Sequence, residues 1–134
     1  MAGCGAAERT VPFRDISSEL RGFQPPRLTR DIFTSRAQFA SYLSSEDPGA
    51  KISVPPIDWI RRSAIIVAAG PRSSTGYILH VTAVRETARH IVVTVHEDAP
   101  TLVTQVVPRV TYPFRLITIP RTPKPLVLHW PGRG

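Results

Sequence analysis

The residues most capable of chemistry in this sequence are histidines, three of which fall close together at His80, His90 and His96. If two paired strands carry them, their even numbering places all three on the polar face of one sheet. Imidazoles gathered in this way can bind Zn²⁺. The further ligands are poorly placed, because the one cysteine is remote in sequence and Glu97 and Asp98 stand at a strand end. We therefore interpret the histidines as solvated surface residues and expect no metal and no cofactor.

A second segment with chemical potential is the sequence GPRSSTG at residues 70–76. It is similar to a phosphate-binding loop, but the Lys-Ser/Thr ending is missing and a strand rather than a helix should follow. Ser73, Ser74 and Thr75 fall in the turn itself, where hydroxyl groups commonly bond the local backbone. Sequence spacing cannot exclude a Ser-His-Asp or Cys-His site, because the residues of such a site can be distant in sequence. No residue here stands out as a member of one. We expect no catalytic residues and no enzymatic activity.

The chain is basic and rich in residues that interrupt helices. Its 134 residues include 17 Lys and Arg against 10 Asp and Glu, with 14 Pro and 8 Gly, and its formal net charge is +7. The basic residues are scattered, and aromatic residues do not alternate with them as in RNA-binding motifs. We expect no nucleic-acid partner, although nucleic-acid binding stays an alternative. A basic surface would equally suit anionic lipid or an acidic protein. No apolar run is long enough to span a membrane.

One helix is predicted in the first half of the sequence, after a strand at residues 28–34. Ser35 followed by Gln38 matches a capping box. The apolar stripe at Phe39, Tyr42 and Leu43 has helical spacing, and the helix should end before Pro48.

The second half of the sequence predicts successive strands. Residues 64–69 form a continuous apolar run, which is typical of a central strand. The alternating segments 77–84 and 91–96 should form a hairpin that turns at residues 86–89. In the first of them Tyr77, Leu79, Val81 and Ala83 should share the apolar face. Further strands are expected at residues 101–107 and 114–119. The fold class is therefore mainly β, an antiparallel sandwich or open barrel, of which an immunoglobulin-like sandwich is one form, with one short N-terminal helix.

The ends of the chain predict a simple domain organisation. Residues 1–20 should be a flexible tether, residues 21–121 one β domain, and residues 122–134 a Pro-rich extended tail. Near the start, the sequence Ala-Gly-Cys ending at Cys4 resembles the end of a bacterial lipobox. The apolar stretch that precedes a lipobox is missing, so lipidation of Cys4 requires a start site further upstream.

Several motifs in this order resemble one known family, the C-terminal domain of the PrcB family, whose members are accessory subunits of protease complexes. The most specific are the Gly-x-Arg-x-x-Thr-Gly-Tyr loop that starts at Gly70 and the closing Pro-aromatic-x-Leu-Ile segment at residues 113–117. The family pattern commonly has Gly-Gly before the tyrosine, where this sequence has Thr75-Gly76. The similarity covers roughly residues 20–121, and its other motifs lie at residues 22–23, 55–59, 91–100 and 105–107.

The resemblance implies a non-enzymatic subunit that helps a secreted or envelope protease to assemble or mature. Family members are typically exported bacterial proteins, often lipoproteins, so it also implies an extracytoplasmic, lipid-anchored location. We expect a monomer when the protein is unbound. The membrane would be reached through the lipid on Cys4, if the true start lies upstream.

Two loops are expected to bind the partner. Glycines at both ends of the first loop would permit positive φ angles, and a proline stiffens one arm, so the loop should project as a defined finger. Its Thr-Gly-Tyr string also resembles a loop of chagasin-like inhibitors of cysteine proteases, which are immunoglobulin-like. Protease inhibition and a hairpin loop without any partner therefore both stay open. The predicted loop residues are Gly70, Pro71, Arg72, Ser73, Ser74, Thr75, Gly76 and Tyr77, with Tyr112, Pro113 and Phe114 in the second loop.

Overall fold

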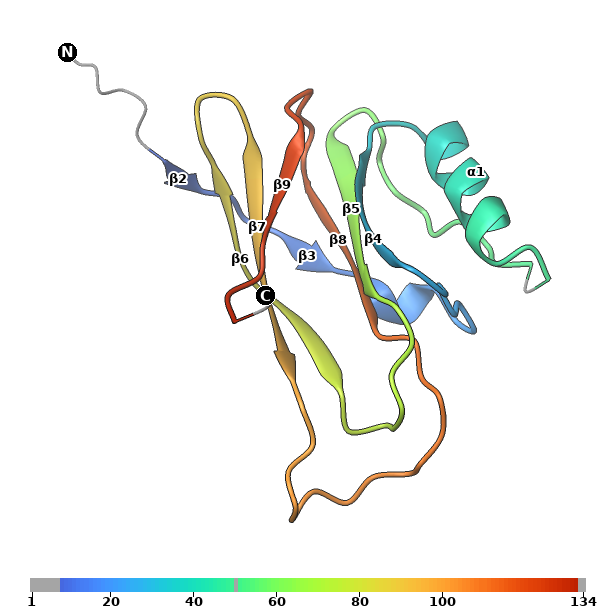
Figure 1. Ribbon diagram of the computed structural model, residues 1–134. Coiled ribbons are helices and arrows are strands. Elements are labelled where there is room, and N and C mark those ends of the chain that lie inside the picture. Colours follow the sequence, from blue (N-terminus) through green and yellow to red (C-terminus); the bar gives the residue numbers. More distant parts are fainter. Residues whose placement is uncertain (1–7, 50, 133–134) are drawn as a thin grey trace.

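The computed structural model describes residues 8–49 and 51–132, and within them two antiparallel-rich sheets pack face to face (Figure 1). The first sheet has the strand order β2-β6-β7-β9, and the second has the order β3-β8-β5-β4. A single α-helix, α1, covers the outer side of the second sheet. The predicted mainly β fold is confirmed, and of the two forms it is an open sandwich rather than a closed barrel. The strands are β2 (Arg9–Thr10), β3 (Arg14–Asp15), β4 (Leu28–Phe33), β5 (Arg62–Ala69), β6 (Ile78–Glu86), β7 (Ile91–Asp98), β8 (Phe114–Pro120) and β9 (Leu126–His129), with a 3-10 turn η1 (Ser17–Glu19) and the helix α1 (Arg36–Glu46).

Strand β5 is the centre of the molecule, as its apolar sequence predicted. It pairs with β4 on one side and with β8 on the other. Side chains alternate across a strand, so β5 supplies two cores. Ile65 and Val67 pack between the two sheets, while Ala64 and Ile66 pack under α1. A strand buried on both faces needs an apolar residue at nearly every position, which explains why its sequence shows no alternation.

The helix begins and ends where its sequence predicted. Ser35 is the N-cap, and its hydroxyl accepts the backbone N–H of Gln38 at 3.2 Å. The Gln38 side chain reaches back to the backbone N–H of Thr34 at 2.9 Å, one residue before the position an ideal capping box uses. Phe39 and Leu43 are buried and Tyr42 packs beside them, so the predicted stripe is confirmed.

The hairpin of β6 and β7 forms as predicted but contains an irregularity. Val81 pairs with Val95 and Ala83 pairs with Thr94, so Thr82 is the extra residue of a β-bulge. The bulge reverses the side-chain alternation, and as a result Val84 is buried in place of Ala83. The predicted apolar face is therefore correct at Leu79 and Val81 and wrong at Ala83, and Tyr77 lies before the strand.

Both ends of the described chain belong to the packed domain. Strand β2 pairs with β6 and β3 pairs with β8, and Val11, Ile16 and Leu20 between and after them are buried. The predicted tether is therefore wrong for residues 8–20, whereas residues 1–7 lie outside the described residues. In the described part of the Pro-rich tail, strand β9 is extended, as predicted, and pairs in parallel with β7. The tether prediction failed because these strands are too short to show a period-two pattern.

The strand predicted at residues 101–107 is wrong. This segment belongs to an irregular, exposed connection between β7 and β8. Its β-branched residues favour a strand, but it extends beyond the end of the sheets, where no neighbouring strand can pair with its whole length (Figure 1). Strand propensity depends on such pairing and packing, so here the position of the segment overrides its composition.

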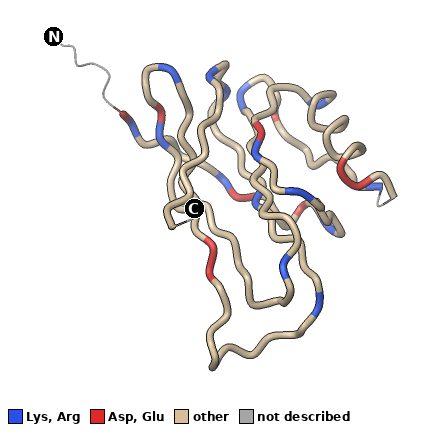
Figure 2. Tube along the Cα trace, in the orientation of Figure 1, with Lys and Arg blue, Asp and Glu red and all other residues tan. Residues whose placement is uncertain are grey.

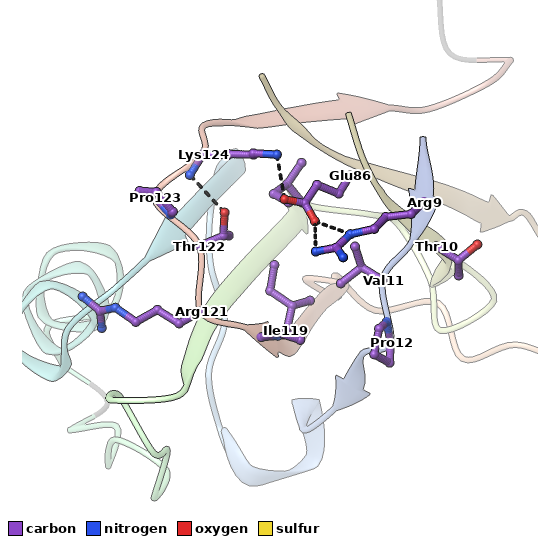
Figure 3. A pocket seen from close by; sticks show the side chains of 12 residues that line it. Arg9, Thr10, Val11, Pro12, Glu86, Ile119, Arg121, Thr122, Pro123 and Lys124 are labelled. Carbon is purple, nitrogen blue, oxygen red and sulfur yellow. Dashed lines mark hydrogen bonds and ion pairs between the residues drawn. The ribbon is translucent and has the colours of Figure 1, made fainter. Parts of the chain in front are cut away.

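An ion-pair cluster joins the two ends of the chain to the β6–β7 hairpin (Figure 3). The Glu86 carboxylate receives Arg9 Nη2 at 2.6 Å and Lys124 Nζ at 2.7 Å. Hydrogen bonds from Lys124 and Arg9 hold the pKa of Glu86 below its ordinary value of 4.5. The cluster therefore stabilises the folded state only while Glu86 is ionised.

Replacement of Phe39 tests the core under the helix. Its ring is fully buried, and its centroid lies 5.1 Å from that of Phe33 and 6.2 Å from that of Trp59. Phe39→Ala should lower the free energy of unfolding by about 3–5 kcal/mol, measured by urea denaturation. Phe13→Ala, at a partly exposed aromatic residue, should cost clearly less, and equal losses would contradict this packing.

Replacement of Glu86 tests the ion-pair cluster through its pH dependence. A folded-state pKa below the unfolded value adds stability that is present above about pH 4.5 and is lost as the pH falls through the folded pKa. The difference in free energy of unfolding between the wild type and Glu86→Gln should therefore shrink when urea denaturation is repeated from neutral pH down to about pH 3. A difference that stays constant over this range would show that the pairs do not stabilise the fold.

Candidate functional site

Two loops extend together beyond one end of the sandwich and form a lobe (Figure 1). The first, residues 70–77, connects β5 to β6, and the second, residues 99–113, connects β7 to β8. We call these two segments the lobe. It contains the predicted first loop and, from the predicted second loop, Tyr112 and Pro113, whereas Phe114 is the first residue of β8.

Hydrogen bonds fasten the two loops of the lobe to each other. Arg72 and Thr111 exchange backbone hydrogen bonds of 2.8 and 2.9 Å, as in an antiparallel bridge. The backbone N–H of Thr75 donates to the carbonyl of Val107 at 3.1 Å, and Val107 returns a bond from its N–H to the Thr75 hydroxyl at 2.9 Å. The Thr111 hydroxyl also donates to the carbonyl of Ser74 at 2.9 Å. The first loop is therefore a braced structure rather than a free finger.

Arg72 anchors the lobe to the sheet. Its Nε and Nη2 atoms donate to the two carboxylate oxygens of Glu97 on β7, at 2.7 and 2.9 Å. The two side chains are only 19% and 14% exposed, and Nη1 also donates to the carbonyls of Ala69 and Pro71. The hydrogen bond with Glu97 raises the pKa of Arg72 further. A bidentate pair this shielded fixes the loop in place, and it leaves the guanidinium little freedom to reach a partner.

The two glycines of the first loop have different roles. Gly70 has a φ of +81°, as predicted, and a Cβ there would lie 3.3 Å from the backbone nitrogen of Leu28. Gly76 does not have a positive φ, so the prediction for it is wrong. A Cβ at Gly76 would lie 2.5 Å from Val106 Cγ1 and 2.6 Å from Pro100 Cβ. The glycine is needed there because the second loop approaches its backbone closely.

A cleft of about 310 Å³ lies where the two loops meet the sheet. It brings together five of the predicted partner-binding residues, two from the first loop and three from the second. The other predicted residues of the first loop do not line it. The lining residues are Thr75, Tyr77, Ile78, Leu79, Arg109, Thr111, Tyr112, Pro113, Phe114 and Arg115.

The lining of the cleft is aromatic and cationic. None of its residues is a carboxylate. Arg115 is held by the carbonyl of Leu79 at 2.7 Å and faces Asp15 at 3.6 Å, whereas Arg109 is exposed and has no ion pair among the described residues. Tyrosine and arginine are the residue types that most often dominate protein-binding surfaces. Sequence reasoning missed Arg109 and Arg115, because only the fold brings them beside the aromatic residues.

His80 and His96 lie on one sheet face, as predicted, but a carboxylate joins them. His80 and His96 are directly paired across β6 and β7. Their Nε2 atoms lie 2.9 and 3.0 Å from the two oxygens of Asp98, and these hydrogen bonds, that from His80 first, lower the pKa of Asp98. His90 lies in the turn, where its N–H donates to Thr87. Within residues 8–49 and 51–132, no three such side chains are arranged to hold a metal ion.

The loop hydroxyls make structural hydrogen bonds. Ser74 is buried, and its hydroxyl accepts the N–H of Gly76 at 3.2 Å, which is the local bond expected for a turn serine. Thr75 bonds the second loop instead, and Ser73 is exposed. These contacts position the loop backbone and bring no histidine to a hydroxyl.

A second hollow, of about 360 Å³, lies at the Glu86 ion-pair cluster (Figure 3). Val11, Ile91 and Ile119 line it with buried side chains. Arg9 and Lys124 share the single carboxylate of Glu86, and Arg121 also lines the hollow, so the lining carries a net positive charge. Nothing in the sequence predicts this hollow, because segments from both ends of the chain form it.

The basic residues are spread over the molecule (Figure 2). Many are paired with carboxylates, among them Arg27 with Glu46 and Arg61 with Asp58. Nucleic-acid binding needs a continuous basic stripe, so this distribution does not favour that alternative. In the part of the chain that the structure describes, no helix is long and apolar enough to cross a membrane. Cys4, the predicted lipidation residue, lies outside the described residues.

Replacement of Gly76 tests the close approach of the two loops. Gly76→Ala should lower the free energy of unfolding by about 1–3 kcal/mol, because its methyl group would overlap Val106 and Pro100. Gly49→Ala is the matched control, since a Cβ at Gly49 meets no atom within 4 Å. Urea denaturation gives both values, and limited proteolysis should cut residues 99–113 faster in Gly76→Ala. Equal stability of the two variants would show that the loops are not packed in this way.

The comparisons with known proteins agree with the motif analysis. The family model described as PrcB C-terminal matches residues 63–120. Neither the search of curated proteins nor the search of solved structures gives a match. The matched segment is shorter than the similarity inferred from the motifs, but it contains all but the first residue of β5, strands β6 to β8, both loops of the lobe and every residue that lines the cleft. Residues 63–120 therefore match the PrcB C-terminal family model, in agreement with the resemblance of the sequence motifs.

Proposed function

We propose that this protein is a non-enzymatic accessory subunit of a protease complex and that it binds its protein partner through the cleft of the lobe. The observation that carries the proposal is the meeting of the two loops. Tyr77 and Tyr112, from loops far apart in sequence, line one cleft with Arg109 beside them. The family match supports an accessory role, because the PrcB family supplies accessory rather than catalytic subunits.

The rigidity of the lobe favours a binding role. Ordering a flexible loop on binding costs free energy, and a loop that is already ordered avoids that cost. The bridge between Arg72 and Thr111 and the ion pair between Arg72 and Glu97 hold the lobe before any partner arrives. The exposed side chain of Ile78 adds an apolar contact at the edge of the cleft. The cleft thus suits a protein surface with apolar groups and a carboxylate to face Arg109.

The location of the protein is part of the proposal. Two observations support extracytoplasmic export with a lipid on Cys4. The sequence that ends at Cys4 resembles a lipobox, and the chain resembles a family whose members are typically exported and often lipoproteins. Such an anchor would hold the domain at the cell envelope, where a secreted or membrane protease is within reach. Mass spectrometry of the protein from its native host tests this point, and an unmodified Cys4 would exclude the lipid anchor.

Affinity purification from the native envelope tests the partner site. The wild type and Phe13→Ala, an exposed aromatic residue outside the lobe, should recover the same peptidase or peptidase-associated protein. Tyr112→Ala and Ile78→Asp should each weaken the captured complex about tenfold or more, measured with the purified partner by calorimetry. Recovery of no protease component, or equal affinity in all four proteins, would contradict the proposal. Inhibition of the recovered protease by the wild type would instead favour the chagasin-like alternative.

A further inference from the structure

The point of the lobe is a hydrogen-bonded turn that carries two aliphatic side chains. The backbone N–H of Thr104 donates to the carbonyl of Thr101 at 3.0 Å, and this bond closes a β-turn. The Thr104 hydroxyl accepts the N–H of Thr101 and bonds the Thr101 hydroxyl, both at 2.9 Å. Leu102 and Val103 therefore occupy the two central positions of a braced turn.

These two side chains have an unusual exposure for their type. Leu102 is fully exposed and Val103 is 90% exposed. Central turn positions favour glycine, proline, asparagine and aspartate, so turn geometry does not call for leucine and valine. Val107 and Val110, on the arm that returns to β8, are more than half exposed as well. Neighbouring apolar side chains that are this exposed are typical of surfaces that contact a partner or a membrane.

The charge around the turn is positive. Residues 99–113 contain Arg109 and no Asp or Glu, and the same holds for residues 70–77 with Arg72. Figure 2 shows the lobe with basic segments along its arms and the acidic segment at its base, on β7. Since Arg72 is paired with Glu97, Arg109 is the cation that the lobe leaves open to a negatively charged surface.

We propose that the turn at residues 101–104 docks the protein on an anionic lipid bilayer, with Leu102 and Val103 inserted among the acyl chains and Arg109 at the headgroups. The turn is convex and presents two side chains, which is far less than the roughly 800 Å² per partner that a stable protein interface buries. A bilayer does not require a complementary surface on the protein. Insertion of a few apolar side chains and attraction of a nearby cation to anionic headgroups both favour binding to it. The bilayer is therefore the occupant that both the shape and the charge of the turn favour.

This inference does not depend on the proposed function. The cleft uses Tyr77, Ile78 and Tyr112, whereas the turn uses Leu102 and Val103, and neither turn residue lines the cleft. The lobe could hold a protein partner at its base while its point rests on the membrane. Leu102→Asp/Val103→Asp should therefore leave the capture of a partner unchanged, and Tyr112→Ala should leave lipid binding unchanged. Arg109 lines the cleft as well, so it is the one residue that the two sites share.

Vesicle sedimentation with the full, non-acylated chain tests the inference. The wild type should sediment with mixed phosphatidylcholine–phosphatidylglycerol vesicles and much less with pure phosphatidylcholine. The double variant Leu102→Asp/Val103→Asp should reduce the bound fraction about tenfold or more. Ile60→Asp is the matched control, because Ile60 is 85% exposed outside the lobe, and it should bind like the wild type. Arg109→Gln should weaken binding to the anionic vesicles only.

A second variant gives a gain of signal in place of a loss. Leu102→Trp should show a blue shift of tryptophan emission when anionic vesicles are added, beyond any shift in the wild type, which contains Trp59 and Trp130. Three results would overturn the inference: no sedimentation of the wild type, equal binding by the double aspartate variant, or an equal loss in Ile60→Asp. Equal binding by the aspartate variant would indicate adsorption through net charge alone.

Discussion

The burial of β5 on both faces is the constraint on which the rest of the structure depends. A strand without a solvent side must be covered twice, and this chain covers it with the other sheet on one face and with α1 on the opposite face. Strands β4 and β8 then satisfy the hydrogen bonds at its two edges. The N-terminal segments and the helix are thus required parts of the domain. The rigid end of β5 also fixes Gly70, and with it the direction in which the first loop leaves the sandwich.

Much of the fold could be predicted because its strongest signals are local. The capping residues Ser35 and Gln38, the apolar run of β5 and the alternation of β7 each follow from neighbouring residues alone. The errors arise where distant contacts decide. The bulge at Thr82 depends on its pairing with β7, the short strands β2 and β3 exist only because β6 and β8 are beside them, and residues 101–107 lack such a neighbour.

The sequence predicted which loop residues form the site but not how they are arranged in space. Motif resemblance pointed to both loops, and the fold brings them together around one cleft. The sequence could not show that Arg72 forms an ion pair with Glu97, or that position 76 needs a glycine because Val106 lies against its backbone. Both contacts join segments that only the folded sandwich brings side by side. It could also not show Arg109 beside Tyr112. Residue types were therefore visible in the sequence, whereas the choice between structural and contact roles required the coordinates.

The position of β9 affects whether the residues matched by the family model can fold as an isolated fragment. Strand β9 pairs with β7 through Leu126 to His129, outside the matched residues 63–120. A fragment cut to those residues would expose the backbone donors and acceptors along one side of β7, whose sequence is rich in valine. Open edges of this kind template pairing between chains. Such a fragment would also lose α1 and β4, which cover β5 and pair with it, so the matched residues need their flanking segments to complete both cores.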